Sequence, residues 1–270
     1  MSTVIGVVAC EALYNVIERY ATDATVRYVP PDRHEFPVNV PDETAVSRVL
    51  QRRIEAVDDP SLDRIVVAYA DDGDTLTGLR SEHAPLAVAR ATDCLSTFLP
   101  ASGSGVGGER KEFGTYYLSR GWIDCAVDSY KLYRGYTGNE RGLRDTFERA
   151  ESSHDDLRFT WNDGELYERA LDAQERVTGD QVGRFVHRIV QYYDTVTLLD
   201  TGDLYPLHHE YAERFRAFLE RLSRGHGDGR EVELTVTDAD DAVLRALLSS
   251  DPDGVESGRC ERYPPGSPVR

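Results

Sequence analysis

The chain has 270 residues, of which 40% are hydrophobic, so it is long enough to bury a core of ordinary size. Acidic residues outnumber basic ones by 48 to 31, which gives a formal net charge of −17 and leaves no basic face to displace counterions from nucleic-acid phosphates. No stretch approaches the roughly 20 apolar residues that cross a bilayer, and the N-terminus lacks the basic start of a signal peptide. We therefore expect a cytoplasmic protein that binds neither nucleic acid nor membrane.

The basic residues are 29 arginines and only two lysines, Lys111 and Lys131. Asp and Glu are scattered along the chain, whereas acidic tails collect them in blocks. In molar salt the Debye length falls to about 3 Å, so a dense like charge costs little repulsion there. The composition predicts a halophilic, haloarchaeal protein, and in that case the acidity carries no information about function.

The distribution of apolar residues predicts alternating strands and helices. Short apolar runs indicate strands at 4–9, 64–69, 85–93, 115–118, 194–199 and 231–236. Apolar residues spaced three and four positions apart indicate helices after Cys10, from 42 to 54, after Asp93, within 123–188 and at 208–223. Gly and Pro mark segments without regular structure at 30–41, 100–110 and 250–270.

This alternation predicts an α/β fold, because strands that alternate with helices form a mainly parallel sheet with helices on both faces. We expect one domain over residues 1–249, with a helical insertion at about 123–165. Residues 100–110 are expected to form a mobile loop, and residues 250–270 a poorly ordered C-terminal tail.

Two of the four cysteines directly follow predicted strands. Cys10 ends the first apolar run, and Cys94 follows the strand at 85–93. Ligands of open α/β sheets bind beyond the carboxyl ends of the strands, so both thiols are expected at the functional edge. Thiolates prefer soft metals, which predicts a site for zinc or a similar ion. The alternative is that both are core residues, since Cys is among the most buried residue types.

Further candidate ligand-binding residues lie near Cys94 and in the acidic loop before it. Asp71 and Gly73 follow the strand at 64–69, where glycine permits close approach of a ligand; a solvated acidic turn is the alternative. Arg90 and Asp93 immediately precede Cys94. Asp93 can cap the next helix, and Arg90 can bind an anionic group.

Four more polar candidates lie after residue 110. Arg120 follows the strand at 115–118 and is a further candidate for anion binding, as is Lys111. Asp200 and Thr201 end the strand at 194–199. If all strands share one parallel sheet, this pair lies on the same edge as the thiols, where it either orients a ligand or caps a helix.

Four other cysteine and histidine residues are expected to have no chemical role. Cys125 lies one turn into a predicted helix and is interpreted as a packing residue, and Cys260 lies in the predicted tail. His208 and His209 are consecutive at a helix start, so they face different ways and are expected to be exposed to solvent.

Short motifs in a fixed order then suggest a family. They are ACEAL around Cys10, the lone His34, YADDGDTLTGL at 69–79, ATDCLSTFL at 91–99, YYLSRGW at 116–122, YYDTVTLLDTG at 192–202 and YPPG at 263–266. In this order they resemble the family catalogued as domain of unknown function 1638, over nearly the whole chain. Members of that family occur mainly in methanogens and other anaerobes, often encoded near corrinoid-dependent methyltransferases.

The resemblance implies a set of metal ligands by position. Cys10, His34 and Cys94 match family positions, and Asp72 stands as an oxygen ligand where the family loop has a cysteine. A cage of four thiolates is therefore not expected, and Glu11 replaces the glycine that follows the first family cysteine. Two thiolates, one imidazole and a carboxylate or open position suit zinc.

Three functions follow as alternatives. The first is a zinc-dependent enzyme of one-carbon, methyl or sulfur transfer, in which the metal activates a substrate thiol or water. The second is a non-catalytic accessory protein that binds or delivers a metal or corrinoid to a methyltransferase partner. The third is a regulator that binds a small molecule and whose cysteines belong to the core.

Overall fold

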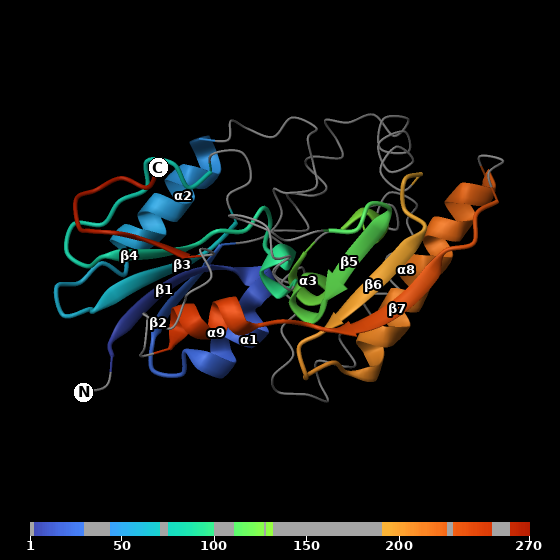
Figure 1. Ribbon diagram of the computed structural model, residues 1–270, viewed down its shortest axis with the longest axis horizontal. Coiled ribbons are helices and arrows are strands. Elements are labelled where there is room, and N and C mark those ends of the chain that lie inside the picture. Colours follow the sequence, from blue (N-terminus) through green and yellow to red (C-terminus); the bar gives the residue numbers. More distant parts are fainter. Residues whose placement is uncertain are drawn as a thin grey trace. The chain divides into compact units, whose positions relative to one another are not determined.

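A computed structural model describes most of the chain and gives eight strands in two sheets among the described residues (Figure 1). It describes residues 3–29, 44–70, 75–99, 111–126, 128–131, 191–225, 229–249 and 260–270. The loop expected at 100–110 and most of the insertion expected at 123–165 lie outside these residues.

The chain divides into two compact units, each built from segments that are distant in sequence. One unit contains residues 1–34, 40–111 and 239–270, and the other contains residues 35–39 and 112–238. Each unit has its own sheet, so two sheets replace the single one expected over residues 1–249. The chain passes between the units several times, which explains why no compositional linker marks the division.

The first unit holds a five-stranded sheet in the order β2-β1-β3-β4-β8. Its strands are β1 (Ile5–Cys10), β2 (Thr25–Val29), β3 (Arg64–Ala68), β4 (Leu86–Ala89) and β8 (Cys260–Tyr263). The first four run parallel, and β8 pairs antiparallel with β4. Every residue of β1, β3 and β4 is buried, as expected for parallel strands covered on both faces.

Helices cover both faces of this sheet, which confirms the predicted fold class. They are α1 (Tyr14–Tyr20), α2 (Thr44–Glu55) and α9 (Ala242–Leu248), with short 3₁₀ turns η1 (Glu11–Leu13) and η2 (Leu95–Phe98). The β1-to-β2 and β2-to-β3 connections move in opposite directions across the sheet, and right-handed crossovers therefore place α1 and α2 on opposite faces. Figure 1 shows α2 on one side of the strands and α1 with α9 on the other.

The prediction of a poorly ordered tail is wrong for residues 260–270. Strand β8 pairs with β4 along its whole length, and the main chain of Val269 bonds to Gly78 and Leu79 at 2.9 and 2.8 Å. Val269 is itself buried. The Gly and Pro content that suggested disorder supplies a turn at Gly266, where φ is +76°.

The C-terminal strand is also fixed by an ion pair. Arg90 bonds to Glu261 and to the Tyr263 hydroxyl at 3.1 Å, and that hydroxyl donates to Glu261. These bonds hold the pKa of Glu261 below its ordinary value of 4.5, with the Arg90 bond as the largest cause. A lowered pKa means that the carboxylate stabilises the fold above its unfolded-state pKa and loses this contribution as the pH falls.

We therefore expect Glu261→Gln to melt at a lower temperature than wild type at pH 7, with a difference that shrinks as the pH falls below about 4.5. The carboxylate is partly exposed, so the difference at pH 7 is small. Thermal melts of both proteins between pH 7 and pH 3 measure it. A difference that stays constant over this range would contradict the proposed linkage.

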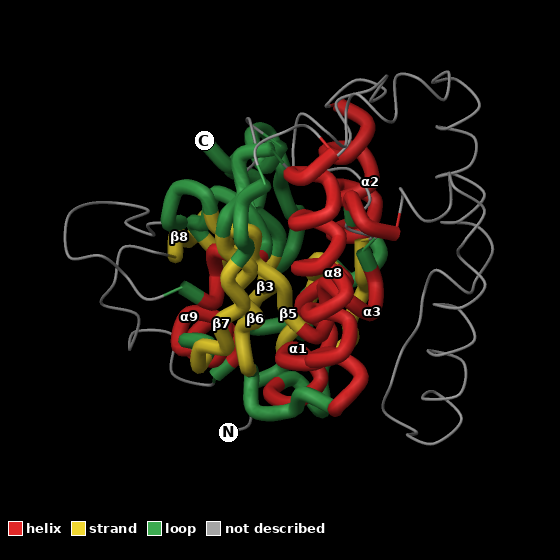
Figure 2. Tube along the Cα trace, turned by 90° about the vertical axis from the view of Figure 1, so that its right-hand side faces the viewer, coloured by secondary structure: helices red, strands yellow, loops and turns green. Residues whose placement is uncertain are grey.

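The second unit holds the parallel sheet β5-β6-β7. Its described elements are β5 (Thr115–Ser119), α3 (Arg120–Cys125), β6 (Thr195–Asp200), α8 (Pro206–Gly225) and β7 (Glu233–Asp238). Helix α8 packs on β6 and β7 (Figure 2). Its buried residues include Tyr211, Phe215 and Phe218. Among the described residues, no helix is both long enough and apolar enough to span a membrane.

Candidate functional site

The two candidate thiols lie at the carboxyl edge of the five-stranded sheet, as predicted. Cys10 is the last residue of β1, and Cys94 lies five residues beyond the end of β4, where η2 begins. Their exposed fractions are 0% and 1%. Strand β3 separates β1 from β4, so the two cysteines come from non-adjacent strands of one sheet.

The candidate polar residues beside Cys94 are engaged with one another and with β8. Asp93 accepts the backbone N–H of Ser96 at 3.0 Å, as a capping residue does, but the element that follows is the 3₁₀ turn η2, and its N-cap position is Cys94. The other oxygen of Asp93 pairs with Lys111 at 2.5 Å. Arg90 is held by Glu261 and the carbonyl of Arg270. Two cations thus flank Cys94, each with an acidic partner.

His34, Asp71, Asp72 and Gly73 lie outside the described residues, so the metal site expected from them stays a prediction.

The segment after the acidic loop is held by hydrogen bonds to α2 and to the turn that follows it. Gln51 exchanges two hydrogen bonds with the main chain of Arg80, at 3.0 and 3.1 Å, and Asp58 accepts the N–H groups of residues 82–84. Within the described part of the chain, no group of three or more His, Cys, Asp or Glu residues could hold a metal.

Asp200 and Thr201 end β6, which belongs to the three-stranded sheet. The expectation that they share a sheet edge with the thiols is therefore wrong, because it assumed a single sheet. Asp200 accepts the N–H of Gly202 at 2.7 Å, which closes a turn at a positive φ of +84°. Thr201 donates to Asp203 at 2.5 Å. These residues fix the strand-end loop of the second unit.

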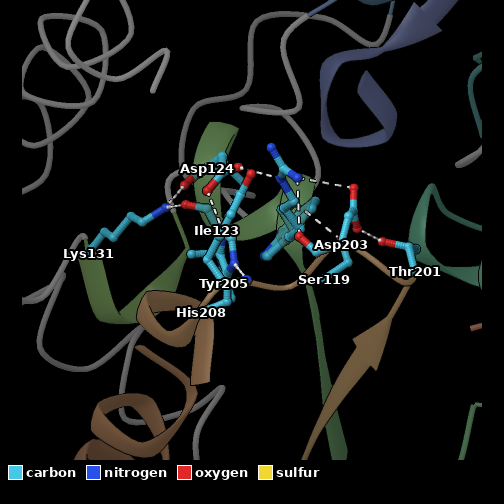
Figure 3. Close-up of polar contacts among 11 residues, drawn as sticks. Ser119, Ile123, Asp124, Lys131, Thr201, Asp203, Tyr205 and His208 are labelled. Atoms are coloured by element: carbon cyan, nitrogen blue, oxygen red, sulfur yellow. Dashed lines mark hydrogen bonds and ion pairs between the residues drawn. The ribbon is translucent and has the colours of Figure 1, made fainter. Parts of the chain in front are cut away.

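A buried network of charged side chains connects the ends of β5 and β6 (Figure 3). Arg120, the first residue of α3, is 2% exposed. Its guanidinium bonds through Nη1 to the carboxylate and the carbonyl of Asp203, at 3.2 and 3.1 Å, and its Nε lies 3.6 Å from Asp124. It also lies over the ring of Tyr205 at 5.0 Å. Arg120 is thus placed at the strand ends, as predicted, with two carboxylates around it.

The network continues to His208, which is buried and not exposed as predicted. Its exposed fraction is 0%, and Asp124, its partner, is also 0% exposed. The Nδ1 atom accepts the N–H of Tyr205 at 2.9 Å, so the ring hydrogen lies on Nε2, which donates to Asp124 at 3.1 Å. Tyr205 precedes the first residue of α8, and His208 is the third. In a capping box, the side chain of the third helical residue accepts the backbone N–H of the N-cap residue. His208 does this for Tyr205, a role usually filled by Glu or Gln.

A second buried pair joins the same two segments. Tyr211, one turn after His208, donates to Asp128 at 2.6 Å, and Asp128 lies four residues after Asp124. Burial raises the pKa of the Tyr211 hydroxyl well above its ordinary value, and the Asp128 carboxylate adds to this effect. The two carboxylates thus bind the same face of α8 at successive turns.

Lys131 closes the network at the end of α3. Its ammonium bonds to the carbonyls of Ile123 and Ala126, the latter at 2.7 Å, and lies 5.3 Å from the centre of the Tyr211 ring. The side chain is 2% exposed. In a chain with only two lysines, a compact ammonium is used where carbonyl groups converge.

We expect Lys131→Met to destabilise the protein by about 2–3 kcal/mol, because two buried carbonyls lose a charged donor. Lys111→Met is the matched control, since the only other lysine is partly exposed and its ion pair contributes at most about 1 kcal/mol. Urea unfolding of both variants measures the difference. Equal effects would contradict the structural role of Lys131.

The residues missed by sequence reasoning had one usable signal. His208 and Tyr211 are three positions apart, which places them on one face of a helix together with Phe215. The sequence analysis placed His208 at the start of this helix and expected it to be exposed. Cys125, the last residue of α3, is buried, in agreement with the predicted packing role.

Comparison with known protein families supports the resemblance over the middle of the chain, residues 43–226, which excludes Cys10, His34 and the YPPG motif. The model of a family described as "Protein of unknown function (DUF1638)" matches residues 43–226, which is more than half of the chain. No curated protein matches this chain, and no solved structure matches it. The match covers β3, β4, Cys94, the Arg120 network and α8. The chain therefore belongs to the DUF1638 family of proteins of unknown function.

Proposed function

We propose that the protein binds zinc or a similar soft metal at the carboxyl edge of its five-stranded sheet. Cys10 and Cys94 are the proposed thiolate ligands, with His34 and Asp72 as the proposed completing ligands. The observation that carries this proposal is that two buried thiols follow two strands of one parallel sheet, at the edge where ligands of such sheets bind.

Ligand chemistry supports this choice of metal. A bound metal ion holds its cysteine ligands deprotonated, which offsets the cost of burying their charge. No group of three candidate ligands comes together among the described residues, so the proposal requires the imidazole of His34 and either the Asp72 carboxylate or a water molecule. Two sulfurs, one nitrogen and one oxygen form a set that zinc accepts.

The proposed reaction class is one-carbon, methyl or sulfur transfer. A soft metal bound there would activate a substrate thiol or water. Arg90 and Lys111 lie in the segments next to Cys94 and would orient an anionic substrate, on exchange of their present carboxylate partners Glu261 and Asp93.

One observation favours a second candidate, a non-catalytic accessory protein that holds or delivers a metal or corrinoid to a methyltransferase. Both thiols are almost completely buried, and a closed metal site with no room for substrate suits storage or delivery better than turnover. The third alternative, a small-molecule regulator with core cysteines, predicts no bound metal.

The test is metal content by inductively coupled plasma mass spectrometry on reduced protein in molar KCl. Near-stoichiometric metal is expected in wild type and in Cys125→Ser, a control that changes an equally buried thiol of the other unit. It should be lost in the Cys10→Ser, Cys94→Ser variant and reduced in His34→Ala. Metal-free wild type, or metal retained in the double variant, would overturn the proposal.

A second assay separates the two candidates. Methylcobalamin and a small thiol are incubated with the metal-loaded protein, and methylated thiol is measured. Turnover that disappears in the Cys10→Ser, Cys94→Ser variant supports the enzyme. Bound metal without turnover supports the accessory protein.

A further inference from the structure

Strand β7 forms one edge of the three-stranded sheet, and no other described strand pairs with its outer side. Its sequence is ELTVTD, and four of its six residues are exposed. Val236, at its centre, is 49% exposed and is among the most exposed large hydrophobic residues in the described part of the chain. Figure 1 shows β7 beside β6 at the end of this sheet.

One hydrogen bond between β7 and the start of β6 fixes which backbone groups face outward. The N–H of Glu233 donates to the carbonyl of Asp194, at the start of β6, at 2.9 Å. The register then runs without interruption from Thr195 opposite Glu233 to Asp200 opposite Asp238. Since successive residues of a strand direct their N–H and C=O groups to opposite sides, those of residues 233, 235 and 237 face β6. Those of residues 234, 236 and 238 face the outer side.

This edge lacks the features by which proteins usually prevent strand addition. It contains no proline and no lysine or arginine, its register has no bulge, and its centre consists of β-branched residues that favour extended chain. Its two acidic residues, Glu233 and Asp238, stand at the ends. An edge of this kind accepts another strand.

We propose that β7 pairs antiparallel with β7 of a second copy of this chain, so that two three-stranded sheets join into one of six strands. In such a pair, residues whose backbone groups face the outer side lie opposite one another. The backbone groups of Glu233 face β6 and those of Asp238 face outward, so no allowed register places Glu233 opposite Asp238. The twofold register centred on Val236 sets Val236 opposite itself and Leu234 opposite Asp238. The edge is therefore self-complementary in hydrogen bonds and free of directly opposed like charges, as a twofold interface requires.

The charge of the chain makes this association depend on salt. Each copy carries a formal charge of −17, so the two copies repel one another at low ionic strength. Salt screens this repulsion without weakening the backbone hydrogen bonds of the joined edge. The dimer should therefore become tighter as KCl is raised.

Sedimentation velocity of the full chain over a range of concentrations and KCl tests the pairing. Wild type should approach twice the chain mass of 30.3 kDa. Val236→Pro removes the outward N–H at the twofold axis but no hydrogen bond to β6. Because each dimer contains two copies of the substitution, the dissociation constant of the dimer should rise at least about a hundredfold. Val236→Thr, which keeps the N–H and the β-branched shape, should remain dimeric. Wild type that stays monomeric at every salt concentration would overturn the proposal.

A charge exchange tests the register and does not depend on proline. Val236→Lys and Val236→Glu, measured separately at moderate salt, each set like charges opposite one another and should be monomeric. Mixed in equal amounts, they should form a heterodimer. Dimers of either variant alone, or a mixture that remains monomeric, would show that Val236 does not lie at a twofold axis. None of these variants alters a proposed metal ligand, so the outcome is independent of the metal proposal.

Discussion

Replacing His208 by leucine is expected to lower the free energy of unfolding by about 3 kcal/mol, whereas glutamine is expected to lower it by at most about 1 kcal/mol. Leucine fills most of the volume of the imidazole but removes two buried hydrogen bonds. One of these bonds accepts the N–H of Tyr205 at the start of α8, and the other donates to the Asp124 carboxylate. Bonds to charged groups contribute more than neutral ones.

Glutamine is the matched control because its amide carries both functions of the ring. Its oxygen can accept from Tyr205, as glutamine does in an ordinary capping box, and its amino group can donate to Asp124. Urea unfolding with a constant dependence on denaturant would give both differences. If leucine and glutamine destabilise the protein equally, packing of the ring and not its hydrogen bonds maintains this junction.

The elements built around apolar runs could be predicted from the sequence. Strands β1, β3, β4, β5 and β6 and helices α1, α2 and α8 were expected near their observed places because their burial imposes a clear hydrophobic pattern. Of the exposed edge strands, β7 was expected at 231–236 and lies at 233–238, whereas β2 was missed, although only its last residue is buried and none of β7 is. Pattern alone thus detects covered elements more dependably than edge strands.

Elements stabilised by distant partners could not be predicted in this way. Strand β8 is short and lies in a Gly- and Pro-rich region, and pairing with β4 together with the Arg90 ion pair gives it order. The separation into two sheets could not be predicted from the sequence either, because a parallel strand has the same local pattern whichever sheet it joins. The expectation that Asp200 lies beside the thiols failed for this reason.

For the candidate site, the sequence predicted which residues follow strands but not which side chains they contact. Cys10, Asp93 and Arg120 were placed correctly at strand ends because a parallel sheet collects such residues at one edge. The partners of Arg120 were not predicted. Asp203 is brought to it by the chain turn at Gly202, and His208 is buried because α8 packs against α3, and neither contact leaves a periodic signal.

Arg120 is the residue of this network whose loss should be most costly. Its guanidinium lies between two carboxylates, and one of them, Asp124, is completely buried. Arg120→Met is expected to lower the free energy of unfolding by about 3–5 kcal/mol, because a buried carboxylate then loses its opposite charge. Removing one member of such a pair costs more than the pair itself contributes.

The decisive comparison is therefore with the Arg120→Met, Asp124→Asn double variant. Asparagine keeps an oxygen that accepts from Nε2 of His208 but carries no charge, so the double variant should be more stable than Arg120→Met alone by about 1–2 kcal/mol. Urea unfolding of the single variants and the double variant completes a mutant cycle. Losses that simply add would show that Arg120 stabilises this junction by its contacts with Asp203 and Tyr205, and that neutralising Asp124 is not its role.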